Sequence, residues 1–267
     1  MLANFHTHTN FCDGKNAPEE VVKAAIEKGF TAIGFSGHGY TDFDLRYCMK
    51  DIDGYIAQIN HLKETYKSDI QIYLGVEEDA FSPMDRNRFD YIIGSSHYFC
   101  IDRNFLPIDS NYDYFKKCLE AFHYDIVQLA ETYYSTFCHY IKLRKPDIIG
   151  HFDLITKFDE LDSPLFLCDA RYHKIAEKYL AEAEDCGCIF EVNTGAIARG
   201  IRTTVYPYEN LLHLLRKRDA RILLSSDSHN IDTLDYGFEE AKRYLYDIGF
   251  RYLYTMFDHE FVKYSIK

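Results

Sequence analysis

Short runs of apolar residues recur along the chain, and segments with helical spacing separate most of them. The runs are rich in β-branched and aromatic residues, which favour strands buried on both faces. Seven runs predict strands, and an eighth candidate follows them: Leu2–Phe5, Ala32–Ser36, Ile70–Val76, Tyr91–Ser95, Ile148–Gly150, Ile189–Asn193, Ile222–Ser226 and then Arg251–Tyr254. This alternation predicts βα units on a parallel sheet.

The intervening segments carry helix start and stop signals. In the first, Asn16 is the predicted N-cap, Pro18 and two glutamates occupy the first turn, and Gly29 marks the end. Similar signals predict helices at Ile52–Tyr66, Tyr172–Asp185, Tyr208–Arg218 and Phe238–Ile248.

One longer segment, Tyr112–Lys145, contains neither glycine nor proline. A single helix of that length would reach about 50 Å at ~1.5 Å per residue, so we expect two helices or a bend. Such an excursion either shapes a substrate pocket or forms an outer helix pair. The loop before it, residues 98–111, is expected to contribute to substrate recognition.

Composition supports one large domain. Hydrophobic residues make up 47% of the 267 residues, which is enough to bury a full-sized core and excludes global disorder. No internal repeat exists beyond the βα alternation, and no low-complexity linker interrupts it. Because α/β barrels routinely use about 250 residues as one unit, we expect a single domain over residues 1–267.

Charge and cysteine content limit the partners. The 42 acidic and 30 basic side chains give a net charge of −12 without a basic run, which argues against a nucleic-acid partner. Apolar runs fall far short of the roughly 18 residues of a membrane span, and the first residues do not read as an export signal. The eight cysteines form no CxxC pair. We therefore expect a cytoplasmic protein with reduced thiols and no membrane partner.

Histidine and carboxylate residues gather at the predicted strand ends. His6 and His8 form a His-x-His pair whose side chains point to one side of an extended chain, where they can share a metal ion. In a parallel α/β barrel the carboxyl ends of all strands share one rim, where active sites are built. The same position after a strand is occupied by further candidate ligands: His38, Glu77, His97, His151, Asp227 and His229.

This set is too large for one tetrahedral site, so more than one ion is implied. A carboxylate such as Glu77 can bridge two ions, and paired ions stabilise the attacking and leaving oxygens of a displacement at phosphorus. The chemistry indicated is hydrolysis. Asp13, in an Asp-Gly turn after the first strand, is either a further ligand or a residue behind the ligands. The remaining histidines lie in or beside helical segments and are assigned to surfaces or packing: His61, His123, His139, His173, His213 and His259.

Together these segments resemble the polymerase and histidinol phosphatase (PHP) family of metal-dependent phosphoesterases over nearly the whole chain. The matching pieces are residues 5–9 with 12–14, 35–38, 75–77, 94–97, 149–153 and 225–229. Ile149–Phe158 (IGHFDLITKF) and Glu191–Gly200 (EVNTGAIARG) resemble the stand-alone histidinol-phosphatases more than the polymerase-associated exonucleases. The resemblance implies a distorted (β/α)7 TIM-like barrel with metal ions at the strand carboxyl ends.

The resemblance also implies a ligand set of two or three divalent ions, Zn, Mn or Fe. It assigns His6, His8, Glu77 and Asp227 to the first ion. Glu77 would bridge to a second ion held by His97 and His151, and a third would be held by Asp13, His38 and His229. Relatives often place a histidine near Asp13, and this chain has only the aspartate there, so occupancy of the third site stays open.

The implied substrate is a small phosphate monoester, with L-histidinol phosphate in histidine biosynthesis as the leading candidate. Arg199 is expected to clamp the phosphate through its planar fork, with Lys157 and Arg202 as further substrate-binding candidates. Asp227, His229 and Arg199 are the candidate catalytic residues. Arg199 would stabilise charge on the phosphoryl oxygens, and either a nearby ion or a proton from His229 or Asp227 would neutralise the leaving alkoxide. The sequence leaves the oligomeric state open.

Three alternative functions could use the same rim of strand ends. A PHP phosphoesterase could act on another small ester, a nucleotide or a phosphopeptide. A carbon–nitrogen hydrolase of the amidohydrolase sort usually carries a ligating lysine on a barrel strand, and no strand end here supplies one. A regulatory module that has lost catalysis is disfavoured by the intact ligand set.

Overall fold

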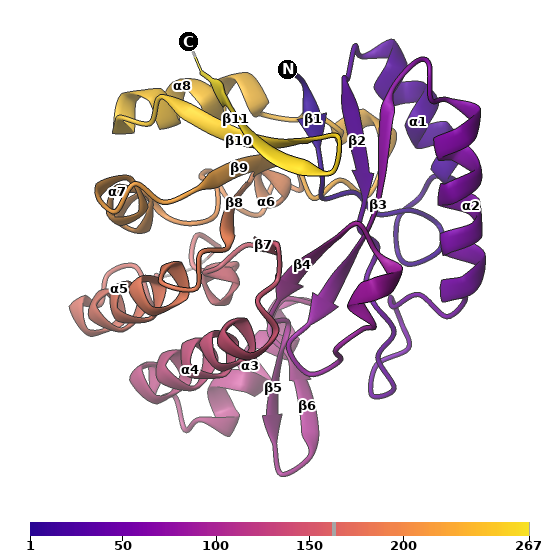
Figure 1. Ribbon diagram of the computed structural model, residues 1–267. Helices are drawn as coiled ribbons and strands as arrows, with labels where there is room; N and C mark the ends of the chain where they lie inside the picture. The colour runs from indigo at the N-terminus through magenta and orange to yellow at the C-terminus, as the bar shows by residue number, and fades with distance from the viewer. Residues whose placement is uncertain (162–163, 267) are drawn as a thin grey trace.

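A computed structural model describes residues 1–161 and 164–266 of the chain. Seven parallel strands form one sheet in the order β1-β2-β3-β4-β7-β8-β9. Its two edges meet beyond the strands, where the His8 amide donates to the Ser228 carbonyl at 2.8 Å and the Ser228 amide donates to the His6 carbonyl at 3.0 Å. The sheet is therefore a nearly closed barrel, and the predicted TIM-like architecture is confirmed (Figure 1).

The barrel strands match the seven predicted runs. They are β1 (Ala3–Asn4), β2 (Ala32–Phe35), β3 (Gln71–Asp79), β4 (Tyr91–Ser95), β7 (Ile148–Ile149), β8 (Ile189–Asn193) and β9 (Ile222–Ser225). The helices are α1 (Pro18–Glu27), α2 (Ile52–Thr65), α3 (Tyr112–Ala121), α4 (Ile126–Arg144), α5 (Ala170–Glu184), α6 (Gly195–Ala198), α7 (Glu209–Lys217) and α8 (Phe238–Ile248). Short 3-10 turns lie at Arg86–Arg88, Leu154–Thr156 and Ile231–Thr233. Figure 1 shows α1 and α2 on one flank of the barrel and α4, α5, α7 and α8 on the other.

Alternate residues of the strands fill the barrel interior. Buried side chains from six strands form one cluster with Phe5, which follows β1, and with Met256 of a hairpin near the C-terminus. The residues from the six strands are Ala32, Tyr73, Tyr91, Ile93, Ile148, Ile189 and Leu223. The Tyr91 hydroxyl donates to the Phe5 carbonyl at 2.6 Å, so it fixes the backbone immediately before His6. The filled interior leaves only the carboxyl rim of the barrel for chemistry.

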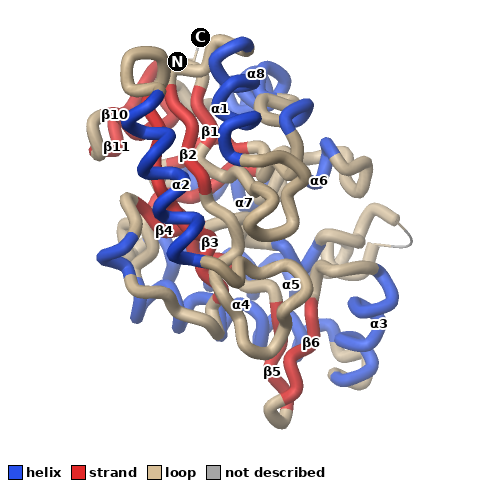
Figure 2. Tube along the Cα trace, turned by 90° about the vertical axis from the view of Figure 1, so that its right-hand side faces the viewer, coloured by secondary structure: helices blue, strands red, loops and turns tan. Residues whose placement is uncertain are grey.

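Two hairpins lie outside the barrel. β5 (Tyr98–Ile101) pairs antiparallel with β6 (Asn104–Pro107), and this hairpin projects at the lower end of both views (Figures 1 and 2). β10 (Tyr252–Phe257) pairs antiparallel with β11 (Glu260–Ser265). The candidate eighth strand is therefore present as β10, but it pairs with β11 and does not join the barrel sheet. The reason is the left-handed pair Asp258 and His259, whose positive φ angles turn the chain back in a two-residue loop after the β9–β1 contact has already joined the barrel edges.

The long helical segment divides into α3 and α4, as expected for a stretch of that length. His123 and Tyr124 adopt left-handed conformations between them, and Asp125 caps α4 by accepting from two backbone amides at 3.0 and 3.1 Å. The predicted N-cap Asn16 is wrong. Ala17 occupies that position, while the Asn16 side chain accepts from the Ile231 amide at 3.1 Å and so ties the first loop to the loop after β9.

Among the described residues, no helix combines the length and apolar character needed to cross a membrane.

Candidate metal centre

The carboxyl ends of the barrel strands and the loops that follow them bring all nine predicted metal ligands to one place. The chain stays extended after β1, so His6 and His8 point to the same side and are both buried. Glu77 belongs to β3, and His38 pairs with it across the end of β2. The nine residues together form four overlapping groups whose ligand atoms converge: His6–His8–Asp227, His6–Glu77–His151, His38–Glu77–His97 and His8–Asp13–His38–His229.

The first group surrounds one oxygen of Glu77. Its Oε2 atom lies 3.3 Å from His6 Nε2 and 3.6 Å from His8 Nε2. The Oδ1 atom of Asp227 lies 3.7 and 3.2 Å from the same two nitrogens. Ligands about 2 Å from a tetrahedral ion lie about 3.3 Å from one another, so the distances from the two histidines to each carboxylate suit metal binding, and His6, His8 and Asp227 form one ligand group.

The second oxygen of Glu77 faces another group. Its Oε1 atom lies 3.0 Å from His151 Nε2 and 3.3 Å from His97 Nε2, and it accepts a hydrogen bond from Ser95 Oγ at 2.7 Å. The two oxygens of one buried carboxylate therefore address two separate sets of histidines. This is the arrangement that a bridging ligand requires.

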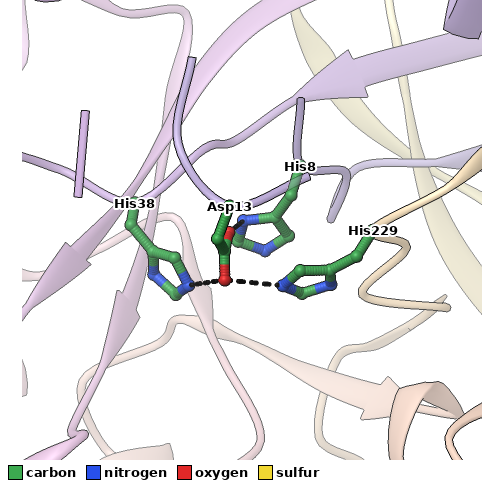
Figure 3. Close-up of side chains that lie close together, drawn as sticks. All are labelled: His8, Asp13, His38 and His229. Carbon is green, nitrogen blue, oxygen red and sulfur yellow. Dashed lines mark ion pairs between the residues drawn. The ribbon is translucent and has the colours of Figure 1, made fainter. Parts of the chain in front are cut away.

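A third group lies nearer the solvent, around Asp13 (Figure 3). The Oδ2 atom of Asp13 lies 3.2 Å from His229 Nε2 and 3.7 Å from His38 Nε2, and its Oδ1 atom lies 3.5 Å from His8 Nδ1. Three histidines thus face one carboxylate. His8 adds to the three residues that the resemblance assigned to this site.

The donor set fits divalent ions. Three fully buried atoms at the centre, His6 Nε2, His8 Nε2 and Glu77 Oε2, have no hydrogen-bond partner among the described residues, although such atoms are normally satisfied. Burial, together with the neighbouring His229 and His38, lowers the pKa of His8 to about 3, so its imidazole is neutral. Neutral imidazole and ionised carboxylate are the forms that bind metal.

The carboxylates of the centre are ionised despite their burial. Burial raises the pKa of Glu77, but the surrounding histidines, His6 first, outweigh it and hold the pKa well below its usual range. The pKa of Asp227 is lowered in the same way, with Arg199 as the largest opposing influence. The centre therefore presents fixed negative charge beneath a layer of imidazoles.

A cavity of about 300 Å³ opens above these groups. Arg199 and Lys157 line it together with seven of the predicted ligands. The Arg199 guanidinium donates from Nη2 to Asp227 Oδ2 at 2.9 Å, and the Lys157 ammonium donates to the Asp109 carbonyl at 2.7 Å and to its carboxylate at 3.1 Å. Both cations therefore face the same space as the metal groups.

The structure does not bring Arg202 to this cavity. Its side chain is 0% exposed, and its guanidinium is sandwiched between the rings of Tyr206 and Tyr208, each 3.9 Å away. It donates to Thr156 Oγ1 at 3.1 Å and to the Val205 carbonyl at 3.2 Å. Arg202 is therefore absent from the lining of this cavity, and substrate binding by this residue stays a prediction.

The six histidines assigned to surfaces or packing are absent from the ligand groups of the described chain. Five are exposed, and His173 is half-buried with its Nε2 atom 2.9 Å from the Leu167 carbonyl.

Three acidic residues that matter to the site were missed. Glu191 of β8 and Asp79 of β3 lie behind the histidines, where Glu191 contacts His6 Nδ1 at 2.5 Å and Asp79 contacts His97 Nδ1 at 3.2 Å. Asp109 lines the cavity beside Lys157. The signal that could have found Glu191 is a charged residue inside an otherwise apolar buried strand.

Comparison with known proteins gives the same picture. The PHP domain profile matches residues 4–195. A "Probable histidinol-phosphatase" from Schizosaccharomyces pombe is 28% identical, over 93% of this chain and 87% of the relative. The histidinol-phosphatase of Bacillus subtilis is 24% identical, over 88% of this chain and 96% of that one.

Among solved structures, the fold matches histidinol phosphate phosphatase from Lactococcus lactis subsp. lactis, which was crystallised with zinc, L-histidinol and phosphate. The TM-score is 0.73 at 20% identity, and the match covers 98% of both chains. This likeness establishes the fold.

Proposed function

The chain belongs to the PHP domain family, and on that premise we propose that it hydrolyses L-histidinol phosphate to L-histidinol and phosphate, a step of histidine biosynthesis. The chain is a PHP-family phosphoesterase that resembles histidinol-phosphatases over most of its length. We also propose that the whole chain is one domain, because β9, which lies beyond the matched residues, pairs with β8 and supplies Asp227 and His229 to the site.

The observation that carries the proposal is Glu77. One buried carboxylate faces histidines on both of its oxygens, at the floor of a cavity whose walls hold Arg199 and Lys157. Metals that share a carboxylate, with cations above them, suit the transfer of a phosphoryl group to water. A single isolated ion would be less able to stabilise both the attacking and the leaving oxygen.

Bound divalent ions supply Lewis-acid stabilisation of the phosphoryl oxygens and acidify water for attack on phosphorus. His6, His8, Glu77 and Asp227 would hold the first ion, Glu77, His97 and His151 the second, and Asp13, His38 and His229 a third. Three such ions carry six positive charges against three carboxylates, so the mouth of the cavity becomes cationic in a chain whose net charge is −12. That local charge suits a phosphate dianion.

The protein's own cations complete the phosphate site. Arg199 presents a planar fork that can donate to two phosphate oxygens, and its contact with Asp227 fixes where the fork points. Lys157 lines the same cavity and adds a second positive charge beside Asp109. We propose that these two residues bind the phosphoryl group and that Arg199 stabilises the charge that develops on it.

Asp227 and His229 connect the phosphate and metal regions. Asp227 contacts Arg199 through Oδ2 and faces His6 and His8 through Oδ1. His229 lies with Nδ1 3.0 Å from the Asp227 carbonyl, which can only accept, so Nδ1 carries the proton and Nε2 is directed at Asp13. We propose both as catalytic residues in different roles: His229 can deliver a proton toward the leaving oxygen, whereas the ionised Asp227 has no proton to give and orients Arg199.

The organic half of the substrate is inferred from size and charge. A cavity of about 300 Å³ lies at the lower end of the range for small-molecule sites, which favours a compact ester over a phosphopeptide. The Asp109 carboxylate in its wall suits a substrate with a cationic amine. Named relatives at 24 to 28% identity, and the Lactococcus structure with L-histidinol and phosphate, support the same choice.

The test is phosphate release from L-histidinol phosphate after the protein has been stripped of metal and then reconstituted. We expect no turnover without metal and recovery when Zn, Mn or Fe(II) is added. A parallel panel of a nucleotide, a phosphopeptide and other small esters identifies the preferred ester. Activity that survives complete metal removal would exclude the proposed chemistry.

A further inference from the structure

Glu191 is a buried carboxylate that touches the metal centre from behind. It belongs to β8 and is 1% exposed. One of its oxygens, Oε1, lies 2.5 Å from His6 Nδ1 and accepts from the Ser225 hydroxyl. The other, Oε2, accepts from the His151 amide at 2.7 Å and from the Asn193 side-chain amide at 3.0 Å.

These contacts fix the state of His6. The Ser225, His151 and Asn193 groups all act as donors toward Glu191, which suits an ionised carboxylate that can only accept. The His6 contact at Nδ1 must then be a donated N–H, so the proton that a metal displaces is the one on Nε2, and the lone pair used for metal binding lies on Nε2. Nε2 is the atom that lies 3.3 Å from Glu77 and has no hydrogen-bond partner in the described structure.

The same carboxylate also serves the second ligand set. Its Oε2 atom holds the His151 backbone, and the His151 ring places Nε2 3.0 Å from Glu77 Oε1. His6 and His151 are 145 residues apart in the sequence, and Glu191 joins them through its two oxygens. A single side chain therefore sets the positions of ligands on both sides of Glu77.

Asn193 extends the network toward the phosphate site. Its amide nitrogen donates to Glu191, and its oxygen accepts from the Gly195 amide at 2.8 Å, at the start of α6. Arg199 follows at the end of that short helix.

We propose that Glu191 is a positioning residue that presets His6 and His151 for divalent-ion binding on both sides of Glu77. This inference rests on the proposed metal-dependent function. Outer carboxylates of this kind typically change metal affinity by about 10- to 100-fold, so the expected effect is measurable.

The test is Glu191→Gln. An amide of the same shape offers one acceptor and one donor group, so whichever way it turns, two of the four donors face its NH₂. We expect divalent-ion affinity, measured by competition with a chromophoric chelator, to fall about 10- to 100-fold. We also expect excess metal to restore kcat, with KM for the phosphate ester within about twofold of wild type, because the substrate-contacting residues are intact.

Glu78 provides a matched control. It is the next residue after Glu77 on β3, is fully buried, and also accepts four hydrogen bonds, from Tyr140, Met84 and twice from Arg144. Among the described residues, no histidine side chain forms a hydrogen bond or an ion pair with the Glu78 carboxylate. Glu78→Gln should therefore lower thermal stability while leaving metal affinity within about twofold of wild type.

The possible results distinguish a failure of the proposed metal-dependent function from a failure of the role assigned to Glu191. Wild-type protein that binds no divalent ion would overturn the proposed function and this inference with it. Wild-type protein that binds metal, beside a Glu191→Gln variant that binds it equally well, would overturn the inference alone. If Glu191→Gln does not fold, Glu191→Asp, which keeps the charge but withdraws it by one methylene, must show the same loss of affinity; wild-type affinity in that variant refutes the role.

Discussion

Replacing Glu77 by glutamine removes the carboxylate on which the metal centre depends. Its two oxygens lie between 2.9 and 3.6 Å from nitrogens of five different histidines. Glutamine keeps the shape of the side chain but removes the negative charge and turns one acceptor into a donor. Because Glu77 belongs to two of the four ligand groups, both of the ions that it would bridge should be affected.

The size of the effect follows from the charge. A unit charge and a divalent ion about 4 Å apart attract by about 8 kcal/mol at an effective dielectric constant near 20. If desolvation and the surrounding imidazoles offset half of this, about 4 kcal/mol is lost for each ion, or roughly a thousandfold in affinity. A ligand present at 100 times its dissociation constant stabilises a fold by about 2.7 kcal/mol, so the variant should also lose most of the metal-induced rise in Tm.

The assay counts metal per chain by elemental analysis after dialysis, alongside phosphate release and thermal unfolding. We expect Glu77→Gln to retain at most one ion, to lose turnover, and to melt at nearly the same temperature with and without added metal. The Glu78→Gln control should keep the wild-type metal content. A folded Glu77→Gln protein that holds two or more ions and turns over substrate would refute the bridging arrangement.

Three further predictions concern other parts of the site. Arg199→Met should lower kcat/KM for phosphate esters about 10- to 100-fold in steady-state assays with metal content unchanged, since a charge-assisted hydrogen bond contributes about 1.5 to 3 kcal/mol; a loss of metal instead would show that Arg199 acts through Asp227. Gly14→Ala places a Cβ atom 2.5 Å from the backbone of His8, so thermal unfolding should show a loss of about 1 to 3 kcal/mol, and an unchanged Tm contradicts this packing. In metal-free protein, burial lowers the pKa of His6, but the charges of Glu191 and Glu77 outweigh burial and raise this pKa well above 6.5. A metal ion that binds His6 must therefore displace a proton. The affinity of the protein for the metal ion weakens as the pH falls below the raised pKa. Zinc added to weakly buffered apoprotein at neutral pH should release protons, and zero release would contradict the assignment.

The parts of the fold that the sequence revealed depend on local patterns. Buried parallel strands are continuous apolar runs, and six of the seven were followed within a few residues by histidine or carboxylate, so the barrel and its rim of ligands could be predicted. The two hairpins could not be predicted in the same way. Their turns at Asp102–Arg103 and Asp258–His259 adopt positive φ without glycine or asparagine, so the usual hairpin signal is missing.

Contacts between distant residues account for the side chains whose surroundings could not be predicted. Asn16 looks like a helix cap, but its side chain accepts from the Ile231 amide in the loop after β9. Arg202 looks like a phosphate ligand, but two tyrosine rings and Thr156 hold it within the protein. Glu191 looks like part of a strand, and its role depends on His6, which lies 185 residues away. Spacing along the chain carries no information about such partners.

The most direct test of the account is the ratio of kcat/KM for L-histidinol phosphate to that for a phosphate monoester without an amine or imidazole, measured on protein of known metal content. The account predicts a ratio of about a hundred or more, or about 2.7 kcal/mol of discrimination. Comparable slow rates on both esters, with two or three ions bound, would contradict the assigned substrate while leaving a metal-dependent phosphoesterase.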